Sequence, residues 1–396
     1  MGKLTANKRT YILYLLLFAI FLVTKMQRGF SESEEEGGIW NILQVVFVFS
    51  GIYISLRYSK TLKGNTTIRL YLIFMLYVWV LAVPTALFTS SVTPSLLFHL
   101  TVVPYGVFVF FLCYYLGLKN EITSFRIILS ITYLLLFFIL YLAMRDYQLD
   151  MDEDKGAVAD VYYIVALLPL IFIYVPEKYR IIPFLIAAVA VMMTGKRAAF
   201  IALAFILVTY FFSSQSAGRR KHGFLRITSF IIIVFISYYT ISELTSYFNL
   251  NMFERLQNLE SDGGSGRAER WAAIISLISY EADNIQLIIG NGYGAVQKAI
   301  GGHAHNDFLE FFYDYGVIAL ILYIVFYVSL LRDCLKMYQK HFIYANEFTA
   351  SVVIAICMAM FSFYAIDSTH ITCSSICLGL FMGEWEKFKR NGYKNV

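Results

Sequence analysis

Apolar runs of helix length recur along almost the whole 396-residue chain and constrain its fold more than any other feature. Hydrophobic residues make up 59% of the sequence and charged residues only 15%, whereas a typical soluble domain has about half apolar and about a quarter charged residues. A membrane-spanning helix needs about 20 predominantly apolar residues, and a transmembrane barrel would need short alternating strands instead. The sequence therefore predicts an all-α, polytopic integral membrane protein.

About twelve transmembrane helices can be placed, and together they form one membrane domain that covers residues 1–396. The seventh and the last are short, so either could be tilted, broken or re-entrant. Basic residues precede and follow the first apolar run and no small-residue cleavage site is evident, so this run is interpreted as an uncleaved first helix. The expected cores are residues 10–24, 39–56, 69–88, 95–117, 123–144, 158–175, 180–193, 198–212, 224–242, 306–331, 347–366 and 370–383.

The distribution of basic residues orients these helices. If both termini are cytoplasmic, most of the 32 lysines and arginines fall in inner loops, as the positive-inside rule requires. This orientation also places the acidic runs at 32–36 and 150–154 outside. Residues 243–304 then form one long periplasmic loop between the ninth and tenth spans, with a short amphipathic helix from Arg267 to Ser279. The net charge of +5 is explained by the loops and does not indicate nucleic-acid binding.

The five cysteines form no disulfide framework, because most lie in or beside apolar segments. His370, Cys373 and Cys377 could be drawn as metal ligands, but thiols packed in a helix are the favoured interpretation. We therefore expect no metal site.

Two arginines in the long loop are candidates for anion binding. Arg267 and Arg270 share a helical face, with Trp271 one turn beyond Arg267. Paired guanidinium groups suit a phosphate or pyrophosphate. The alternative is a solvated amphipathic helix whose tryptophan anchors it at the membrane surface.

A second basic pair, Lys196 and Arg197, lies between two apolar runs on the predicted outer side. Cations that oppose the positive-inside bias need another reason, and an anionic ligand is one. Contact with lipid headgroups is the alternative.

Polar chemistry is densest between Gly301 and Gly316, where the loop meets the tenth span. His305 is the favoured general base, because a neutral imidazole accepts a hydroxyl proton at neutral pH. Glu310 could orient it, and His303 is expected to help bind the ligand.

The acids of this stretch have a second interpretation. Helical spacing puts Asn306, Glu310 and Asp314 near a common face, where the first two could contact the substrate. Alternatively, Asp307 caps the helix and Glu310 occupies its third position, which would make both acids structural. The upstream run Gly290–Gly294 is expected to be a flexible turn.

These segments together resemble the O-antigen ligase and polymerase superfamily of bacterial polysaccharide assembly. The resemblance covers residues 190–320 or so, and beyond them only the hydropathy agrees. Lys196 departs from it, because a small polar residue is more usual there, so Arg197 carries over better. The matching pieces are Thr-Gly-Lys-Arg at 194–197, Gly-Arg-Ala-Glu-Arg-Trp at 266–271, Ile-Ile-Gly-Asn-Gly-Tyr-Gly at 288–294, and His-Ala-His-Asn-Asp-Phe-Leu-Glu at 303–310 with Gly316 downstream.

The resemblance implies a glycosyltransferase at the periplasmic face of the bacterial inner membrane, with an undecaprenyl-pyrophosphate-linked oligosaccharide as donor and no metal or other cofactor. An O-antigen polymerase, which extends another lipid-linked repeat unit, is favoured. The alternatives are an O-antigen ligase acting on lipid A-core and, less favoured, a transporter or flippase for the same glycan. Membrane lipids, a chain-length regulator and a flippase of the same pathway are the expected partners.

Overall fold

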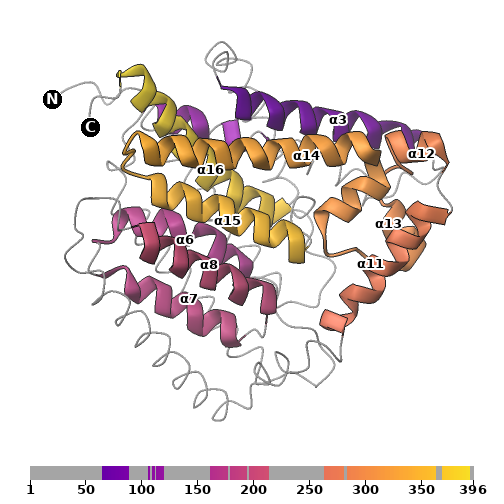
Figure 1. The fold of residues 1–396 in the computed structure, drawn as a ribbon, viewed down its shortest axis with the longest axis horizontal. Helices are drawn as coiled ribbons and strands as arrows, with labels where there is room; N and C mark the ends of the chain where they lie inside the picture. Colours follow the sequence, from indigo (N-terminus) through magenta and orange to yellow (C-terminus); the bar gives the residue numbers. More distant parts are fainter. Residues whose placement is uncertain are drawn as a thin grey trace, which may run out of the picture.

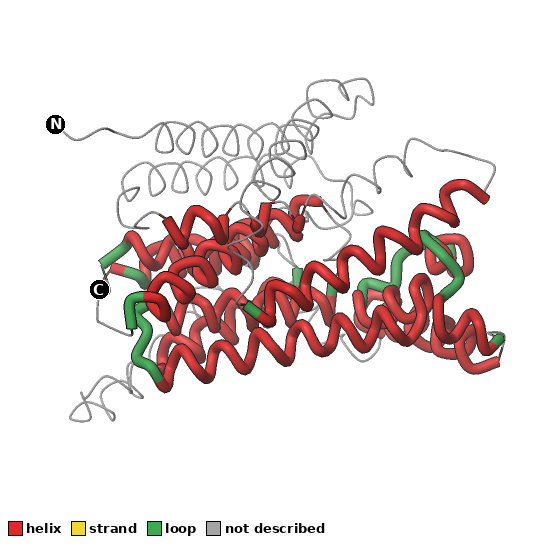
Figure 2. Tube along the Cα trace, turned by 90° about the horizontal axis from the view of Figure 1, so that it is seen from above, coloured by secondary structure: helices red, strands yellow, loops and turns green. Residues whose placement is uncertain are grey.

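The computed structural model describes residues 65–88, 106–119 without 108 and 112, 161–176, 179–193, 196–213, 263–280, 283–362 and 368–392. Within these ranges the chain forms helices and no strand (Figure 2). The all-α prediction is confirmed for this part of the chain. The helices are α3 (Thr66–Phe88), α6 (Val161–Tyr174), α7 (Ile181–Met193), α8 (Arg197–Ser213), α11 (Gly263–Tyr280), α12 (Asn284–Ile289), α13 (Ala295–Ile300), α14 (Asp307–Gln339), α15 (Ala345–Phe361) and α16 (Ser368–Arg390), with further helical residues within 106–119.

The expected spans at 69–88, 180–193, 198–212, 306–331 and 370–383 coincide with helices, and those at 95–117, 158–175 and 347–366 do so in part, over their described residues. The spans at 10–24, 39–56, 123–144 and 224–242 lie outside the described residues. Among the helices described, α14 alone is both long and apolar enough to cross a membrane. The count of twelve spans therefore stays a prediction. α7, at the seventh expected span, has only 13 residues, whereas α16 has 23 because it continues past the apolar run 370–383 into charged residues.

The helices α3, α6, α7, α8, α14, α15 and α16 lie side by side, and α11, α12 and α13 lie together at one end (Figure 1). α14 packs against α3 and α15, and α15 also packs against α6 and α8. Interlocked aromatic rings fill the α3–α14 contact, where Phe74 stacks on Tyr323 and meets Phe311 edge-on. The helices α11, α12 and α13 all contact α14. The helices of the long loop are therefore held against α14.

α14 is interrupted at Gly316, and the turn that follows α12 packs against this interruption. Gly316 has φ 79° and ψ −179°, which is not helical and which a residue with a side chain rarely adopts. A Cβ atom on Gly316 would collide with the carbonyl of Ile288, and one on Gly290 would collide with that of Asp314. The two backbones approach this closely because both positions are glycine.

Candidate active site

Basic side chains from two separate segments converge beside α11. Arg197 begins α8 with only 8% of its surface exposed, and Lys196 precedes it. Burial lowers the pKa of Arg267 on α11, and the neighbouring charges of Arg197 and Arg270 lower it further. The structure therefore brings together the four basic residues that the sequence analysis selected. We call Lys196, Arg197, Arg267 and Arg270 the cationic cluster.

A tyrosine from α6 supports this cluster. The side chains of Tyr162 and Arg267 are hydrogen-bonded, and Tyr162 also bonds to Ser362 after α15. Such a contact offsets part of the cost of holding several guanidinium groups together. The sequence analysis missed Tyr162 because a single hydroxyl in an apolar span carries no signal of what it will contact.

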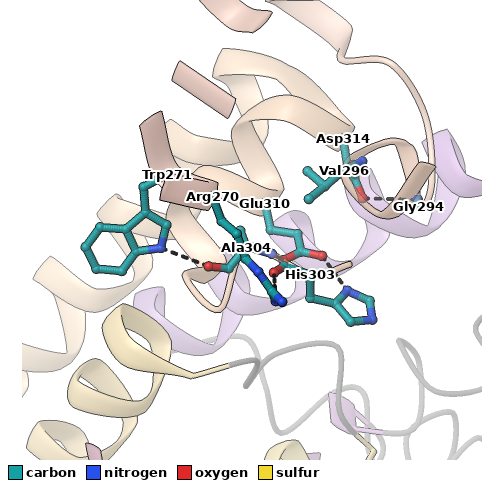
Figure 3. A network of polar contacts seen from close by, with 8 residues as sticks. All are labelled: Arg270, Trp271, Gly294, Val296, His303, Ala304, Glu310 and Asp314. Carbon is teal, nitrogen blue, oxygen red and sulfur yellow. Dashed lines mark hydrogen bonds and ion pairs between the residues drawn. The ribbon is translucent and has the colours of Figure 1, made fainter. Parts of the chain in front are cut away.

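Residues 303 and 304, which lie just before α14, are held against α11 by two side chains of that helix (Figure 3). Nη1 of Arg270 donates to the carbonyl of His303 at 3.2 Å, and Nε1 of Trp271 donates to that of Ala304 at 2.8 Å. Trp271 therefore contacts residues 303–305, which we call the histidine segment, and this contact does not belong to the alternative in which Trp271 only anchors the helix at the membrane surface.

Glu310 approaches the same segment from α14 (Figure 3). Its Oε1 lies 2.8 Å from Nδ1 of His303, and its Oε2 accepts the backbone N–H of Ala304 at 3.0 Å. Glu310 is only 2% exposed. Glu310 therefore contacts both the ring of His303 and the backbone of Ala304. The expectation that Glu310 orients His305 was therefore wrong in its partner, because the carboxylate contacts His303.

His305 faces the cationic cluster in an unusual backbone conformation. Its φ of 54° is left-handed, which is uncommon for a residue with a side chain. Burial and nearby positive charges lower its pKa from 6.5 to about 4, so its imidazole is neutral at neutral pH and can accept a proton. The residues whose charges contribute are Arg267, Arg270, His303 and Lys196.

The start of α14 differs from the sequence prediction by one residue. Asn306, and not Asp307, is the N-cap, since its side chain accepts the N–H of Leu309 at 3.2 Å. Asp307 is the first helical residue and accepts a hydrogen bond from Tyr323 at 2.9 Å. Capping is therefore the role that the contacts support for Asn306.

The Gly290–Gly294 turn, expected to be flexible, is bound to α14. The carboxylate of Asp314 accepts the backbone N–H groups of Gly294 at 3.1 Å and Val296 at 2.9 Å (Figure 3). The Asp314 carbonyl accepts the N–H of Gly292 at 2.8 Å. A buried carboxylate needs such donors, so Glu310 and Asp314 each hold a loop segment in place.

Within the described residues, no group of three or more histidine, cysteine or acidic side chains is arranged to hold a metal ion. Cys373 and Cys377 are buried in α16, where Sγ of Cys377 donates to the carbonyl of Ala166 at 3.3 Å. This contact agrees with thiols that pack between helices. The side chain of His370 lies outside the described residues.

Residues 182–324 match the family described as O-antigen ligase, and these residues include the cationic cluster and the histidine segment. A search of curated proteins found no match. Residues 182–324 are therefore a domain of the O-antigen ligase family, in agreement with the resemblance seen in the sequence.

Proposed function

We propose that this protein transfers a glycan from undecaprenyl pyrophosphate to an acceptor hydroxyl, at the periplasmic face of the bacterial inner membrane. The observation that carries the proposal is the cationic cluster beside a neutral His305. The match to the O-antigen ligase family, whose members are membrane proteins of O-antigen assembly, supports the same class of reaction. The match fits a polymerase and a ligase equally and does not distinguish their acceptors.

The cationic cluster would bind the donor pyrophosphate. Arg267 and Arg270 can each present paired N–H groups to phosphate oxygens, and Arg197 and Lys196 add charge from a second segment. Such groups stabilise the negative charge that develops on the leaving pyrophosphate. Their burial makes this effect larger than it would be in water.

His305 would activate the acceptor. The acceptor hydroxyl gives its proton to the imidazole while its oxygen forms a bond to the anomeric carbon of the donor glycan. The bond between that carbon and the phosphate oxygen breaks, and undecaprenyl pyrophosphate leaves with the electron pair. Pyrophosphate is a good leaving group, so this step needs neither a nucleotide sugar nor a metal ion from the protein.

We favour a polymerase, whose acceptor is a further lipid-linked repeat unit. The aromatic-rich helices suit a lipid-linked acceptor. An O-antigen ligase, whose acceptor is lipid A-core, uses the same donor chemistry and is the alternative. A transporter of the lipid-linked glycan is less favoured, because the buried carboxylates of Glu310 and Asp314 are occupied by contacts with loop segments.

The test is the lipopolysaccharide gel pattern of a deletion strain that carries the wild-type gene, His305→Ala or Arg270→Ala. We expect both variants to reach the membrane and to lose the ladder of long glycans. His341→Ala is the matched control, because this histidine is exposed at the far end of α14 and also has a positive φ, of 52°.

The deletion strain alone distinguishes the two acceptors. A single repeat unit on the core indicates a lost polymerase, whereas bare core with accumulated lipid-linked polymer indicates a lost ligase. An unchanged ladder in the deletion strain would refute both functions. A normal ladder from His305→Ala would refute its role as base.

A further inference from the structure

Both polar backbone groups of Ala304 are bonded to side chains from two different helices. Trp271 on α11 donates to its carbonyl at 2.8 Å, and Glu310 on α14 accepts from its N–H at 3.0 Å (Figure 3). Ala304 has no exposed surface. A buried backbone group takes the orientation that its partners dictate, and here these partners are two side chains instead of a helix or a strand.

The preceding residue is fixed by the same two helices. Arg270 donates to the carbonyl of His303 at 3.2 Å, and Glu310 contacts the ring of His303 at 2.8 Å. Glu310 therefore bonds to two consecutive residues at once.

The next residue, His305, has an unfavourable backbone conformation. It is left-handed, with φ 54°, which is unfavourable for a residue with a side chain. A strained conformation persists only where the surrounding contacts determine it. The contacts to Ala304 lie immediately before this turn, and the cap formed by Asn306 lies immediately after it.

We propose that Trp271 and Glu310 are positioning residues, which hold Ala304 from both sides and thereby set the turn that presents His305 to the cationic cluster. The inference rests on the function proposed above. α11 would both bind the pyrophosphate, through Arg267 and Arg270, and position His305, through Trp271. One helix would then fix the separation between the bound pyrophosphate and the base, on which the transfer rate depends steeply.

The test measures kcat and KM for the donor with full-length protein in lipid nanodiscs. The substrate is the lipid-linked glycan extracted from the deletion strain. For Trp271→Phe, which keeps the ring but loses the N–H donor, we expect kcat to fall about 10–100-fold, with KM within about twofold of wild type. Glu310→Ala should behave similarly. Glu310→Gln should recover part of kcat, because the amide oxygen can still accept from Ala304.

The double variant Trp271→Phe/Glu310→Ala tests whether both act on the same turn. We expect it to lose little more kcat than the worse single variant, because groups that act on a shared element are non-additive. Trp385→Phe and Glu347→Gln are the matched controls, since both residues are buried in helices outside the site. These controls should keep the wild-type kcat.

Three outcomes would overturn the inference: kcat within about twofold of wild type in both single variants, losses that multiply in the double variant, or equal losses in the controls. All three require that the wild-type protein transfers glycan. An inactive wild type would instead contradict the proposed function itself.

Discussion

Binding of the donor should make the protein take up a proton at His305. Burial and the charges of Arg267, Arg270, His303 and Lys196 hold its pKa near 4. A bound pyrophosphate would compensate these positive charges and so raise that pKa toward its ordinary value of about 6.5. Protonation of His305 in the complex then exceeds that in the free protein most strongly between these two values, and the difference vanishes at higher pH.

The size of the effect follows from the two pKa values. At pH 5.5, an imidazole with a pKa of about 4 is about 3% protonated, and one with the ordinary pKa is about 90% protonated. Full compensation would therefore take up about 0.9 proton per donor bound. Burial, the largest cause of the shift, remains in the complex, so we expect about half of this amount.

The assay is titration calorimetry of the full-length protein in nanodiscs, performed in two buffers of different ionisation enthalpy. The ligand is a short-chain polyprenyl-pyrophosphate monosaccharide, whose diesterified phosphates do not titrate in this range. Uptake should be lost in His305→Gln, retained for the most part in His303→Gln, and absent at pH 8. Saturable binding without proton uptake, or undiminished uptake in His305→Gln, would refute the electrostatic coupling.

The same coupling should separate the two kinetic profiles. The acid limb of kcat/KM reports the free protein and should lie near pH 4, whereas that of kcat reports the complex and should lie at higher pH. A base that strengthens when the donor arrives would be most active once the pyrophosphate is in place.

The sequence predicted the helices well because their signal is local. Runs such as 69–88 and 180–193 are apolar on all sides and can only be buried or face lipid, and α3 and α7 form there. The basic residues of the site were also identifiable, because Arg197 lies between two apolar runs against the orientation rule and Arg267 shares a helical face with Arg270.

The pairings within the site were not identifiable from the sequence. Moving the cap by one residue, from Asp307 to Asn306, turns the following side chains by about 100° about the helix axis. The sequence alone therefore did not show that Glu310 contacts His303. The contact between Trp271 and Ala304 joins residues 33 positions apart, and no periodicity in the sequence reports such a distance.

Two further substitutions test the donor site and its support. Arg270→Lys should raise the donor KM about 10-fold, because lysine loses the paired N–H geometry, and should also loosen His303; an unchanged KM would remove Arg270 from the donor site. Gly316→Ala should lower the melting temperature in detergent, at a cost of about 2 kcal/mol or more, because the new Cβ meets the backbone carbonyl of Ile288. Gly301→Ala is the control for a positive φ alone, since Gly301 is left-handed, with φ 71° and ψ 16°, and no atom lies within 4 Å of its Cβ. Gly316→Ala should lose more, because its φ and ψ are adopted almost only by glycine and its Cβ also meets the backbone of α12. Equal losses would mean that this contact contributes nothing to holding the site.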